Sequence, residues 1–524
     1  MSDRLQQYAV VAPEKGIMRN LPSYLLNDNA VEDSENIRYF QGKAEKVFGY
    51  EKFSANTVEG VEKIRHIKDY FTFDGSDLLV IATDTKLKYW NPTTSLFVDI
   101  GSYATGSDYN PSSTIYNNKL YITNRNDWVK RYDGTTLDNV PALDDTATGD
   151  IEGGYASCKA KLIRGFQNFL VLGNTLEDGY NTSQRLRWSR YGNPTLWKNE
   201  SSGAGQAGYM DFLEDYDPIM AMELLGNALA VYKKKSIYLV SYVGPPAIFN
   251  KVRVVNDIGA ISGNVVVPYK SGHYFCGLDN FYFFDGTNVT PIGDPIKKQF
   301  FGEINIAKKE LIFGYLLKEF SEIWWVYPKL ESDYPNYAVV FNFDTGAWSH
   351  RKMPNCMAMG SYWQTTSQTW DDTTKPWGSM DMYWDENYLL YGTPKNLIGQ
   401  TDGYIQDIKS YLTDFDGADI DGWMKTKLFD FKDPLHIKRL QRIQFLISRE
   451  GDYNLEVIVR TADNVDESPT EYGPYYYNLQ TTSPAYLDLD ISARYFQFIF
   501  RTQLKAQPWK LQGMIFHYVT RGPH

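Results

Sequence analysis

The chain has 524 residues, 43% of them hydrophobic and 22% charged, a composition typical of a folded protein long enough to contain several cores. Its formal net charge of −11 disfavours tight DNA binding, because proteins that grip phosphates usually carry a surplus of Lys and Arg. Aromatic residues make up 15% of the chain, which favours strands and large buried interfaces.

The cysteines and the apolar segments restrict the class of protein further. Cys158, Cys276 and Cys356 are odd in number and far apart, so they predict neither a disulfide framework nor a zinc ribbon and indicate assembly in a reducing cytosol. The first residues contain no apolar segment of signal-peptide length. No apolar run approaches the roughly 18 residues of a membrane helix, so we expect no membrane span.

Residues 1–60 are polar and irregular, with short apolar pieces between Pro13, Pro22, Gly42 and Gly49. Residues 29–36 could cap one short helical turn. Otherwise the segment predicts an N-terminal extended arm that needs a partner surface, from this chain or from another.

From residue 61 to residue 410 the pattern becomes regular. Apolar or aromatic strands alternate with turns such as Asp133-Gly134 and Asp285-Gly286, in sets of three or four strands that recur every 35–60 residues or so. A four-stranded sheet cannot bury both faces alone, so successive sheets stack around an axis. The pattern predicts an irregular β-propeller of six or seven blades. The predicted sets begin near residues 63, 114, 161, 220, 265, 307 and 387.

Three segments interrupt this pattern and predict long loops at one or both ends of the propeller. They are residues 137–157, 191–217 and 363–384, the last of which carries four tryptophans.

Residues 411–524 contain longer strands in which apolar and polar residues alternate. Such alternation predicts one buried and one solvated face, and therefore a C-terminal β-sandwich of two sheets. The predicted strands are residues 422–431, 438–449, 453–460, 485–489, 494–501 and 510–518. The complete prediction is a mostly β chain with an arm (1–60), a propeller (61–410) and a sandwich (411–524). The arm and the sandwich are expected to pack together as a platform.

A series of short sequence matches connects the chain to a known family. The matches are, in order, Gly16-Ile17 to Leu21-Pro22, Glu35-Asn36-Ile37-Arg38, Val231-Tyr232, Ser236-Ile237-Tyr238, Tyr242-Val243-Gly244, Ile258-Gly259-Ala260, Ser271-Gly272-His273-Tyr274-Phe275, Phe281-Tyr282-Phe283-Phe284-Asp285-Gly286, Phe313-Gly314-Tyr315, Ile323-Trp324-Trp325-Val326-Tyr327-Pro328, Val340-Phe341-Asn342-Phe343-Asp344, Thr426-Lys427 to Phe431, and Lys438-Arg439-Leu440. In this order the chain resembles podophage tail nozzle proteins, also described as tail tubular protein B-like or packaged-DNA stabilisation proteins.

The resemblance implies a structural component of a short phage tail. Such a protein forms a ring, typically a homohexamer, below the portal and adaptor, and this ring retains packaged double-stranded DNA and conducts it during ejection. It implies a location in the virion, assembly in the host cytoplasm, contacts with portal/adaptor proteins and with tail fibres or other tail proteins, and DNA that passes without sequence-specific binding. In that family the propeller forms the body of the nozzle.

Catalytic motifs are scarce in the sequence. None of the six histidines belongs to an HxH, HExxH or HxxxH pair, and there is no GxSxG motif or P-loop. Residues 343–348 come nearest to a sialidase-type Asp-box, but Trp348 comes one residue early and there is no second copy. We therefore expect no enzyme activity, metal or cofactor. The alternative from another class is a carbohydrate-active or receptor-binding propeller at the tail tip, and a third is a generic scaffold propeller.

Three clusters of charge are the candidate channel-lining or interface residues: Lys233, Lys234 and Lys235; Asp211, Glu214, Asp215 and Asp217; and Asp414, Asp416, Asp419 and Asp421. The lysines form a turn that is either a solvated hairpin tip or a contact with an acidic neighbour in the ring or with DNA phosphate. The acidic loops are interpreted as solvated or as lumen lining, with a calcium site as the alternative. In a six-fold lumen, they would form a repulsive sleeve that keeps DNA from sticking.

Overall fold

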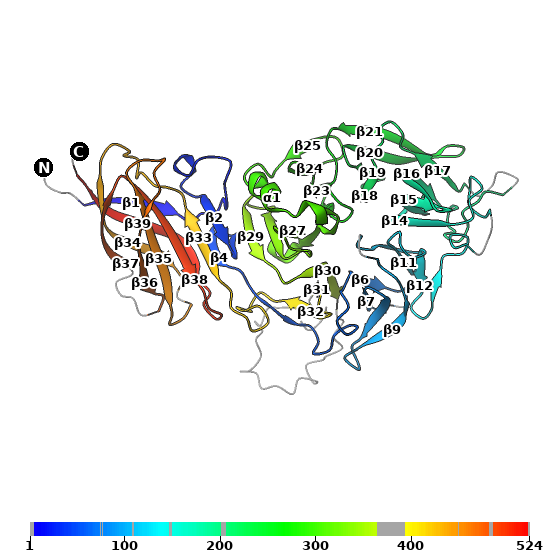
Figure 1. Ribbon diagram of the computed structural model, residues 1–524, viewed down its shortest axis with the longest axis horizontal. Coiled ribbons are helices and arrows are strands. Elements are labelled where there is room, and N and C mark those ends of the chain that lie inside the picture. Colours follow the sequence, from blue (N-terminus) through cyan, green and yellow to red (C-terminus); the bar gives the residue numbers. More distant parts are fainter. Residues whose placement is uncertain are drawn as a thin grey trace.

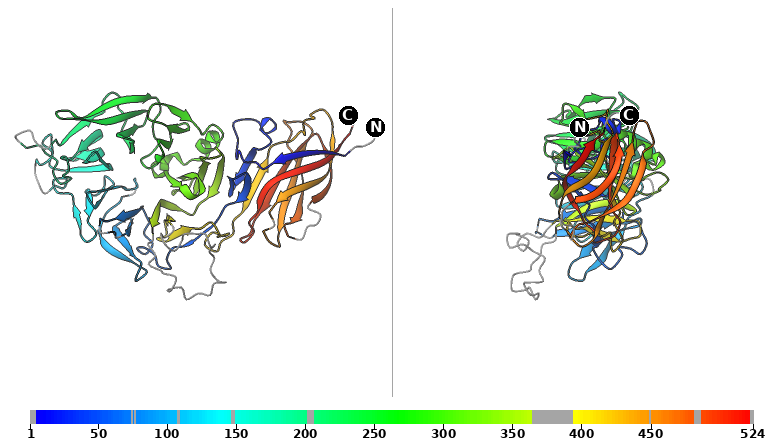
Figure 2. Two further views of the ribbon diagram at one scale, coloured as in Figure 1. Left: turned by 180° about the vertical axis from the view of Figure 1, so that it is seen from behind. Right: turned by 90° about the vertical axis from the view of Figure 1, so that its left-hand side faces the viewer.

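The computed structural model describes residues 5–73, 75, 77–106, 109–145, 149–200, 206–363, 394–448, 450–480 and 486–521. Two lobes lie side by side, a ring of small sheets and a sandwich of two larger sheets (Figure 1). The first and last strands, β1 (Gln6–Val11) and β39 (Lys510–Thr520), pair with each other in the sandwich. Both chain ends therefore lie on the side of the sandwich away from the ring (Figure 2).

The ring is a β-propeller with seven four-stranded antiparallel blades among the described residues. Blades 1 to 4 are β6 (His66–Phe71), β7 (Asp77–Ala82), β8 (Lys86–Asn91) and β9 (Leu96–Ser102); β10 (Ser112–Tyr116), β11 (Lys119–Thr123), β12 (Lys130–Tyr132) and β13 (Leu137–Asn139); β14 (Cys158–Phe166), β15 (Phe169–Glu177), β16 (Tyr180–Trp188) and β17 (Gly208–Asp211); and β18 (Ile219–Leu225), β19 (Ala228–Lys233), β20 (Ser236–Gly244) and β21 (Ile248–Asn256).

Blades 5 to 7 are β22 (Val267–Tyr269), β23 (Gly272–Cys276), β24 (Phe281–Phe284) and β25 (Val289–Pro291); β26 (Phe313–Leu317), β27 (Glu322–Tyr327), β28 (Tyr337–Asn342) and β29 (Trp348–Lys352); and β30 (Cys356–Trp363), β31 (Pro394–Gln400), β32 (Ile405–Ile408) and β5 (Tyr50–Lys52). The first strands of the blades contact one another in a closed circle, from β6 through β10, β14, β18, β22, β26 and β30 back to β6. This circle defines a propeller and confirms the predicted fold class.

The turn chemistry predicted from the sequence holds in blades 2 and 5. Asp133 Oδ1 accepts hydrogen bonds from the backbone N–H groups of Thr135 (3.1 Å) and Thr136 (2.9 Å). Asp285 Oδ1 does the same for Thr287 (2.7 Å) and Asn288 (2.6 Å). In both turns the glycine after the aspartate has a positive φ, which only glycine adopts at little cost.

Other predicted elements differ in detail. The predicted strand at 307–315 begins as a 3-10 helix, η2 (Ile306–Leu311), because the Asn305 side chain accepts the N–H of Ala307 and caps a helical turn. Two further 3-10 helices, η1 (Ser23–Leu25) and η3 (Lys318–Phe320), and one α-helix, α1 (Lys297–Glu303), are also present. The predicted loops at 137–157 and 191–217 contain the short outer strands β13 and β17. The loop predicted at 363–384 and the strand predicted at 387–393 lie outside the described residues, apart from Trp363.

Blade 7 is completed by a strand from the start of the chain. Its first strand is β30, which was not predicted, and its outer strand is β5, which pairs with β32 through Glu51 opposite Asp407. The Tyr50 ring stacks on Phe415 with 4.8 Å between centroids. A strand contributed from the N-terminal segment covers the open edge of the last blade and thereby closes the ring.

The sandwich is built from both ends of the chain. One sheet has the order β3 (Ile37–Phe40), β4 (Lys43–Lys46), β39, β34 (Lys438–Ile447) and β37 (Tyr486–Ala493), with β1 on β39; the other has the order β2 (Val31–Glu35), β33 (Gly422–Thr426), β38 (Tyr495–Thr502), β35 (Asn454–Ala462) and β36 (Thr470–Asn478). Phe498 and Phe516 stack across the two sheets with 4.7 Å between centroids. The segment predicted as an extended arm therefore contains five strands. β3 pairs locally with β4, whereas β1, β2, β4 and β5 pair with strands hundreds of residues away.

A buried ion pair joins the sandwich to blade 6. Arg38 Nε donates to Glu322 Oε1 at 3.0 Å, with side chains only 8% and 4% exposed. Glu45 lies 3.2 Å from another nitrogen of the same guanidinium, and the ring of Phe320 packs against it. The backbone N–H of Asn36 also donates to the His350 carbonyl at 2.9 Å. The outer strand β29 is thus covered by the sandwich, so the two lobes share one continuous core.

We predict that Arg38→Met lowers the free energy of unfolding by about 3–5 kcal/mol, because it leaves the Glu322 carboxylate buried without its charge partner. Urea unfolding followed by tryptophan fluorescence measures the effect. Arg439→Met is the matched control, since it removes an exposed ion pair with Asp490 and should cost about 1 kcal/mol or less. The double variant Arg38→Met/Glu322→Leu should recover part of the loss. Equal midpoints for Arg38→Met and the control would show that the pair does not hold the lobes together.

Candidate functional site

The axis of the propeller contains a cavity of about 270 Å³. It is lined by residues from the first strands of most blades and from the segments next to them. These residues are His66, Ile67, Lys68, Asp69, Pro111, Ser112, Ser113, Arg164, Asn264, Tyr315, Met359, Gly360 and Ser361. Because most blades contribute to the wall, only the closed ring creates this site.

A second cavity of about 180 Å³ continues along the axis. Arg65, Asn110 and Glu223 are among the residues that line only this second cavity. Four residues border both cavities and form the constriction between them: His66, Arg164, Asn264 and Met359. Side chains of the described residues therefore extend toward the axis where the two cavities meet.

Polar side chains connect blades 1 to 4 across the constriction. His66 Nε2 lies 2.7 Å from Ser113 Oγ, so blade 1 is linked to blade 2. The Arg164 guanidinium donates to Ser112 Oγ at 2.9 Å and forms an ion pair with Glu223, so it links blades 2, 3 and 4. Burial lowers the pKa of His66 to about 3, which leaves its ring neutral at physiological pH.

Next to this network lie Lys68 and the carboxyl pair of Asp69 and Asp77. Burial, together with the adjacent Asp77 carboxyl, raises the pKa of Asp69 to about 8. The two carboxyls are close enough to influence each other's titration. Asp69 lines the cavity, and its raised pKa favours a protonated carboxyl there.

The structure brings the lysine turn and the first acidic loop together. The Lys233 side chain is fully buried, and its Nζ donates to the carbonyls of Phe212 (2.8 Å) and Asp215 (2.7 Å) and pairs with the Asp215 carboxylate. Burial lowers the pKa of Lys233 to about 8. For Lys233 the interpretation as a solvated hairpin tip is wrong, because an acidic group of its own chain holds the ammonium inside. Lys234 is half-buried and Lys235 is exposed.

The remaining acidic residues of the first loop also meet partners within the chain. Asp211 accepts from Arg185 Nε at 2.7 Å, and Glu214 pairs with Lys251 at 2.6 Å. Asp217 lies at the end of the same loop and is half-buried. This loop therefore joins the outer strands of blades 3 and 4.

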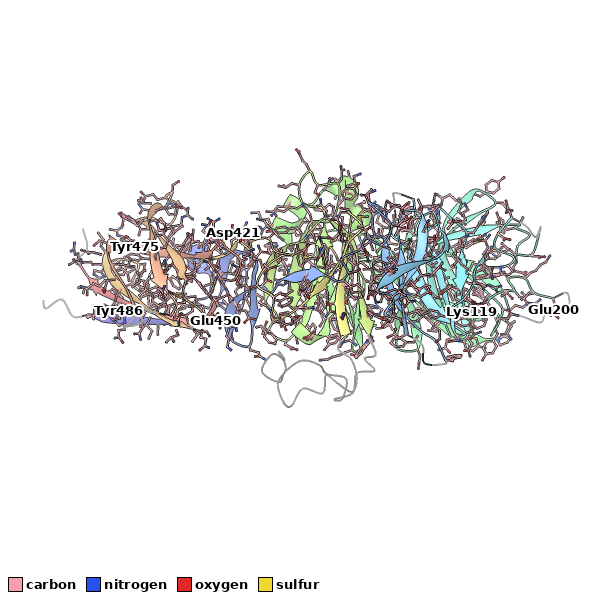
Figure 3. All side chains as sticks on the ribbon, turned by 90° about the horizontal axis from the view of Figure 1, so that it is seen from below. Lys119, Glu200, Asp421, Glu450, Tyr475 and Tyr486 are labelled. Carbon is pink, nitrogen blue, oxygen red and sulfur yellow. The ribbon has the colours of Figure 1, made fainter. Side chains whose placement is uncertain are left out.

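The second acidic loop lies between blade 7 and the sandwich. Asp421 accepts two hydrogen bonds of 2.8 Å from Arg501 and lies in the part of the sandwich next to the propeller (Figure 3). Asp419 accepts from the Lys505 N–H at 2.8 Å, Asp414 from the Gly417 N–H at 2.7 Å, and Asp416 is 3.7 Å from Lys52 Nζ. Each of these carboxylates thus has a partner in its own chain.

The described residues contain neither a cluster of metal ligands nor a membrane-spanning helix. Within the described ranges, no three His, Cys, Asp or Glu side chains are grouped so that they could hold a metal ion. The described helices include none that is long and apolar enough to cross a membrane.

The axial residues were not identified from the sequence. A signal was present, because His66, Lys68, Arg164 and Glu223 are polar residues within the first strands of three predicted sets. The meeting of these positions on one axis depends on ring closure, which the sequence pattern does not specify.

Comparisons with known proteins add little to this description. No protein-family profile and no curated protein sequence matches the chain. Among solved structures, YCF48 from Cyanidioschyzon merolae aligns over 69% of this chain and 98% of its own, with 8% identity and a TM-score of 0.36. The AfRom2 CNH domain aligns over 70% of this chain and 97% of its own, with 10% identity and a TM-score of 0.35. The propeller is therefore established by its own strand pairing and not by these similarities.

We predict that Lys233→Met destabilises the chain by about 2–3 kcal/mol, because the buried ammonium loses two carbonyl acceptors and Asp215 loses its charge partner. Lys235→Met, the same change on an exposed side chain two residues away, should shift stability by less than about 0.5 kcal/mol. Urea midpoints of the two variants provide the measurement. A larger effect at Lys235 than at Lys233 would contradict the buried position of Lys233.

We also predict that Asp69→Asn gains stability relative to the wild type as pH rises from 5 to 8. A carboxyl whose pKa is raised on folding stabilises the folded state most below its unfolded pKa, and that contribution declines as pH rises toward the folded pKa of about 8. The asparagine variant lacks this titration, so its advantage should grow over the interval and level off above it. Urea unfolding at pH 5, 6, 7 and 8 measures the slope, and parallel pH profiles would contradict the shift.

Proposed function

We propose that the chain is a structural subunit of a short phage tail, which forms a ring-shaped nozzle below the portal/adaptor, retains packaged DNA and conducts it during ejection. The ordered sequence matches to podophage nozzle proteins suggest this function. The observation that carries it is the sandwich made from both ends of the chain and joined to blade 6 through Arg38 and Glu322. A platform built in this way holds the propeller at a fixed position, which a ring subunit requires.

In the proposed nozzle the DNA passes between copies of the chain and not through one propeller. The axial cavity has a volume of only about 270 Å³, and side chains of several blades meet at one end of it. Duplex DNA is too wide for this cavity, because its major groove alone is about 12 Å across. A lumen wide enough for the duplex therefore requires several subunits around a common axis, and a homohexamer is the proposed number. Portal/adaptor proteins and tail fibres or other tail proteins would contact this ring in the virion.

The net charge of the chain is more compatible with DNA that passes through the ring than with tight DNA binding. A net charge of −11 on each copy repels DNA, and six copies would multiply that field. The carboxylates of the two acidic loops are partly neutralised by Arg185, Lys251 and Arg501, so the proposed sleeve would depend on the exposed Asp416 and Asp419 more than on Asp421. This function requires no catalytic residue.

A carbohydrate-active or receptor-binding propeller at the tail tip is the second candidate. The axial cavity favours it, because a concave site with convergent polar groups is the usual place for a small ligand. In that case the propeller would act as a separate binding domain and would not need to form a ring.

Images of purified assemblies, and of virions that carry the chain, test the proposal. We expect a ring of six copies with a central hole, and native mass spectrometry should give six times the mass of the 60.3 kDa chain. The purified chain is examined alone and after mixing with the portal–adaptor complex of the same virion. A chain that stays monomeric under both conditions and binds or cleaves glycans would replace the nozzle with the second candidate.

A further inference from the structure

The axial cavity contains a cation without a charge partner. Lys68 lies on β6 two residues after His66 and lines the same cavity. In the part of the chain that the structure describes, its ammonium forms no hydrogen bond and no ion pair, unlike Arg164, which is held by Ser112 and Glu223. A half-buried lysine without a carboxylate partner is costly unless something else compensates its charge.

Lys68 and Arg164 are the two cations on the cavity wall. Burial and the nearby Arg164 guanidinium lower the pKa of Lys68, whereas the carboxyls of Asp69 and Glu223 raise it to a smaller extent. The carboxylate of Glu223 is already paired with Arg164 and lines only the second cavity. Asp69 is the remaining acid in the first cavity, and with its pKa raised to about 8 it keeps its proton at neutral pH. A bound anion would therefore be attracted by Lys68 and Arg164, the two cations that line the cavity.

The cavity also has hydrogen-bond donors for an anion and a definite size. Ser361 supplies a hydroxyl group and Asn264 an amide, and the Ser113 hydroxyl, which also contacts His66, lies beside them. Its volume of about 270 Å³ lies slightly below the range of drug-sized ligand sites. The site thus fits a small molecule or the acidic group of one, and it is too small for a polymer strand.

We propose that the propeller axis binds a small oxyanion, the phosphate or carboxylate group of a small ligand, at Lys68 beside Arg164. Lys68 donates charge-assisted hydrogen bonds to the anion, and Arg164, already held in place by its own partners, adds electrostatic attraction. The whole site lies within one chain. The proposal therefore stands or fails independently of ring formation.

Isothermal titration calorimetry of the full-length chain at pH 7 and constant ionic strength tests it. One arm uses inorganic phosphate and the other uses glucuronate, so that a phosphate-bearing and a carboxylate-bearing ligand are distinguished. We expect saturable one-to-one binding of at least one probe. Lys68→Met should weaken it about tenfold or more, because one charge-assisted contact is lost. Lys235→Met, the same change on an exposed lysine outside the cavity, should leave the affinity unchanged.

Two outcomes would overturn the proposal: neither probe binds the wild-type chain, or Lys68→Met binds as tightly as Lys235→Met does. Should Lys68→Met fail to fold, crystals of the wild-type chain soaked in selenate decide the question. An anomalous peak within hydrogen-bond distance of Lys68 Nζ supports the site, and a cavity without such a peak contradicts it.

Discussion

Strand pairing between distant parts of the sequence is the constraint on which the rest of this structure depends. An unpaired edge of a sheet exposes a row of backbone donors and acceptors, so a ring of sheets needs a partner for its last blade. Here β5 pairs with β32, more than 350 residues later. β2, which precedes β5 in the chain, pairs with β33 in the sandwich. The first fifty residues therefore belong to two lobes at once. The buried contact between Arg38 and Glu322 lies in the same part of the chain, where β3 packs against β29 of blade 6.

The closed ring also decides what lies on its axis. His66, Arg164 and Glu223 come from three different blades, and they form one polar network only because the first strands meet in a circle. The same closure makes the axis narrow, since the side chains that link the blades also fill the space between them. The two proposals therefore concern different spaces in the assembly. A single propeller offers a site for a small ligand, whereas the passage of DNA in the proposed nozzle belongs to the space between copies.

Much of the local structure could be predicted from the sequence. The Asp-Gly turns of blades 2 and 5 were identified correctly, because an aspartate that accepts two backbone N–H groups followed by a glycine with positive φ is a local device. The long strands of the sandwich were identified from their alternation. The short outer strands β13 and β17 were missed, because three or four half-exposed residues carry little pattern. Lys233 was misread for a related reason: a lysine in a turn looks solvated until the loop containing Asp215 folds over it.

A mostly β chain, the propeller, the sandwich and the turns between strands can all be predicted from the sequence, because they depend on alternation and turn chemistry within a few residues. The number of blades, the role of the first fifty residues and the axial cavity become known only from the folded chain. Each of these depends on partners far apart in the chain: β5 with β32, Arg38 with Glu322, and Lys68 beside Arg164. Periodicity states which face of a strand is buried, but it does not state which strand covers it.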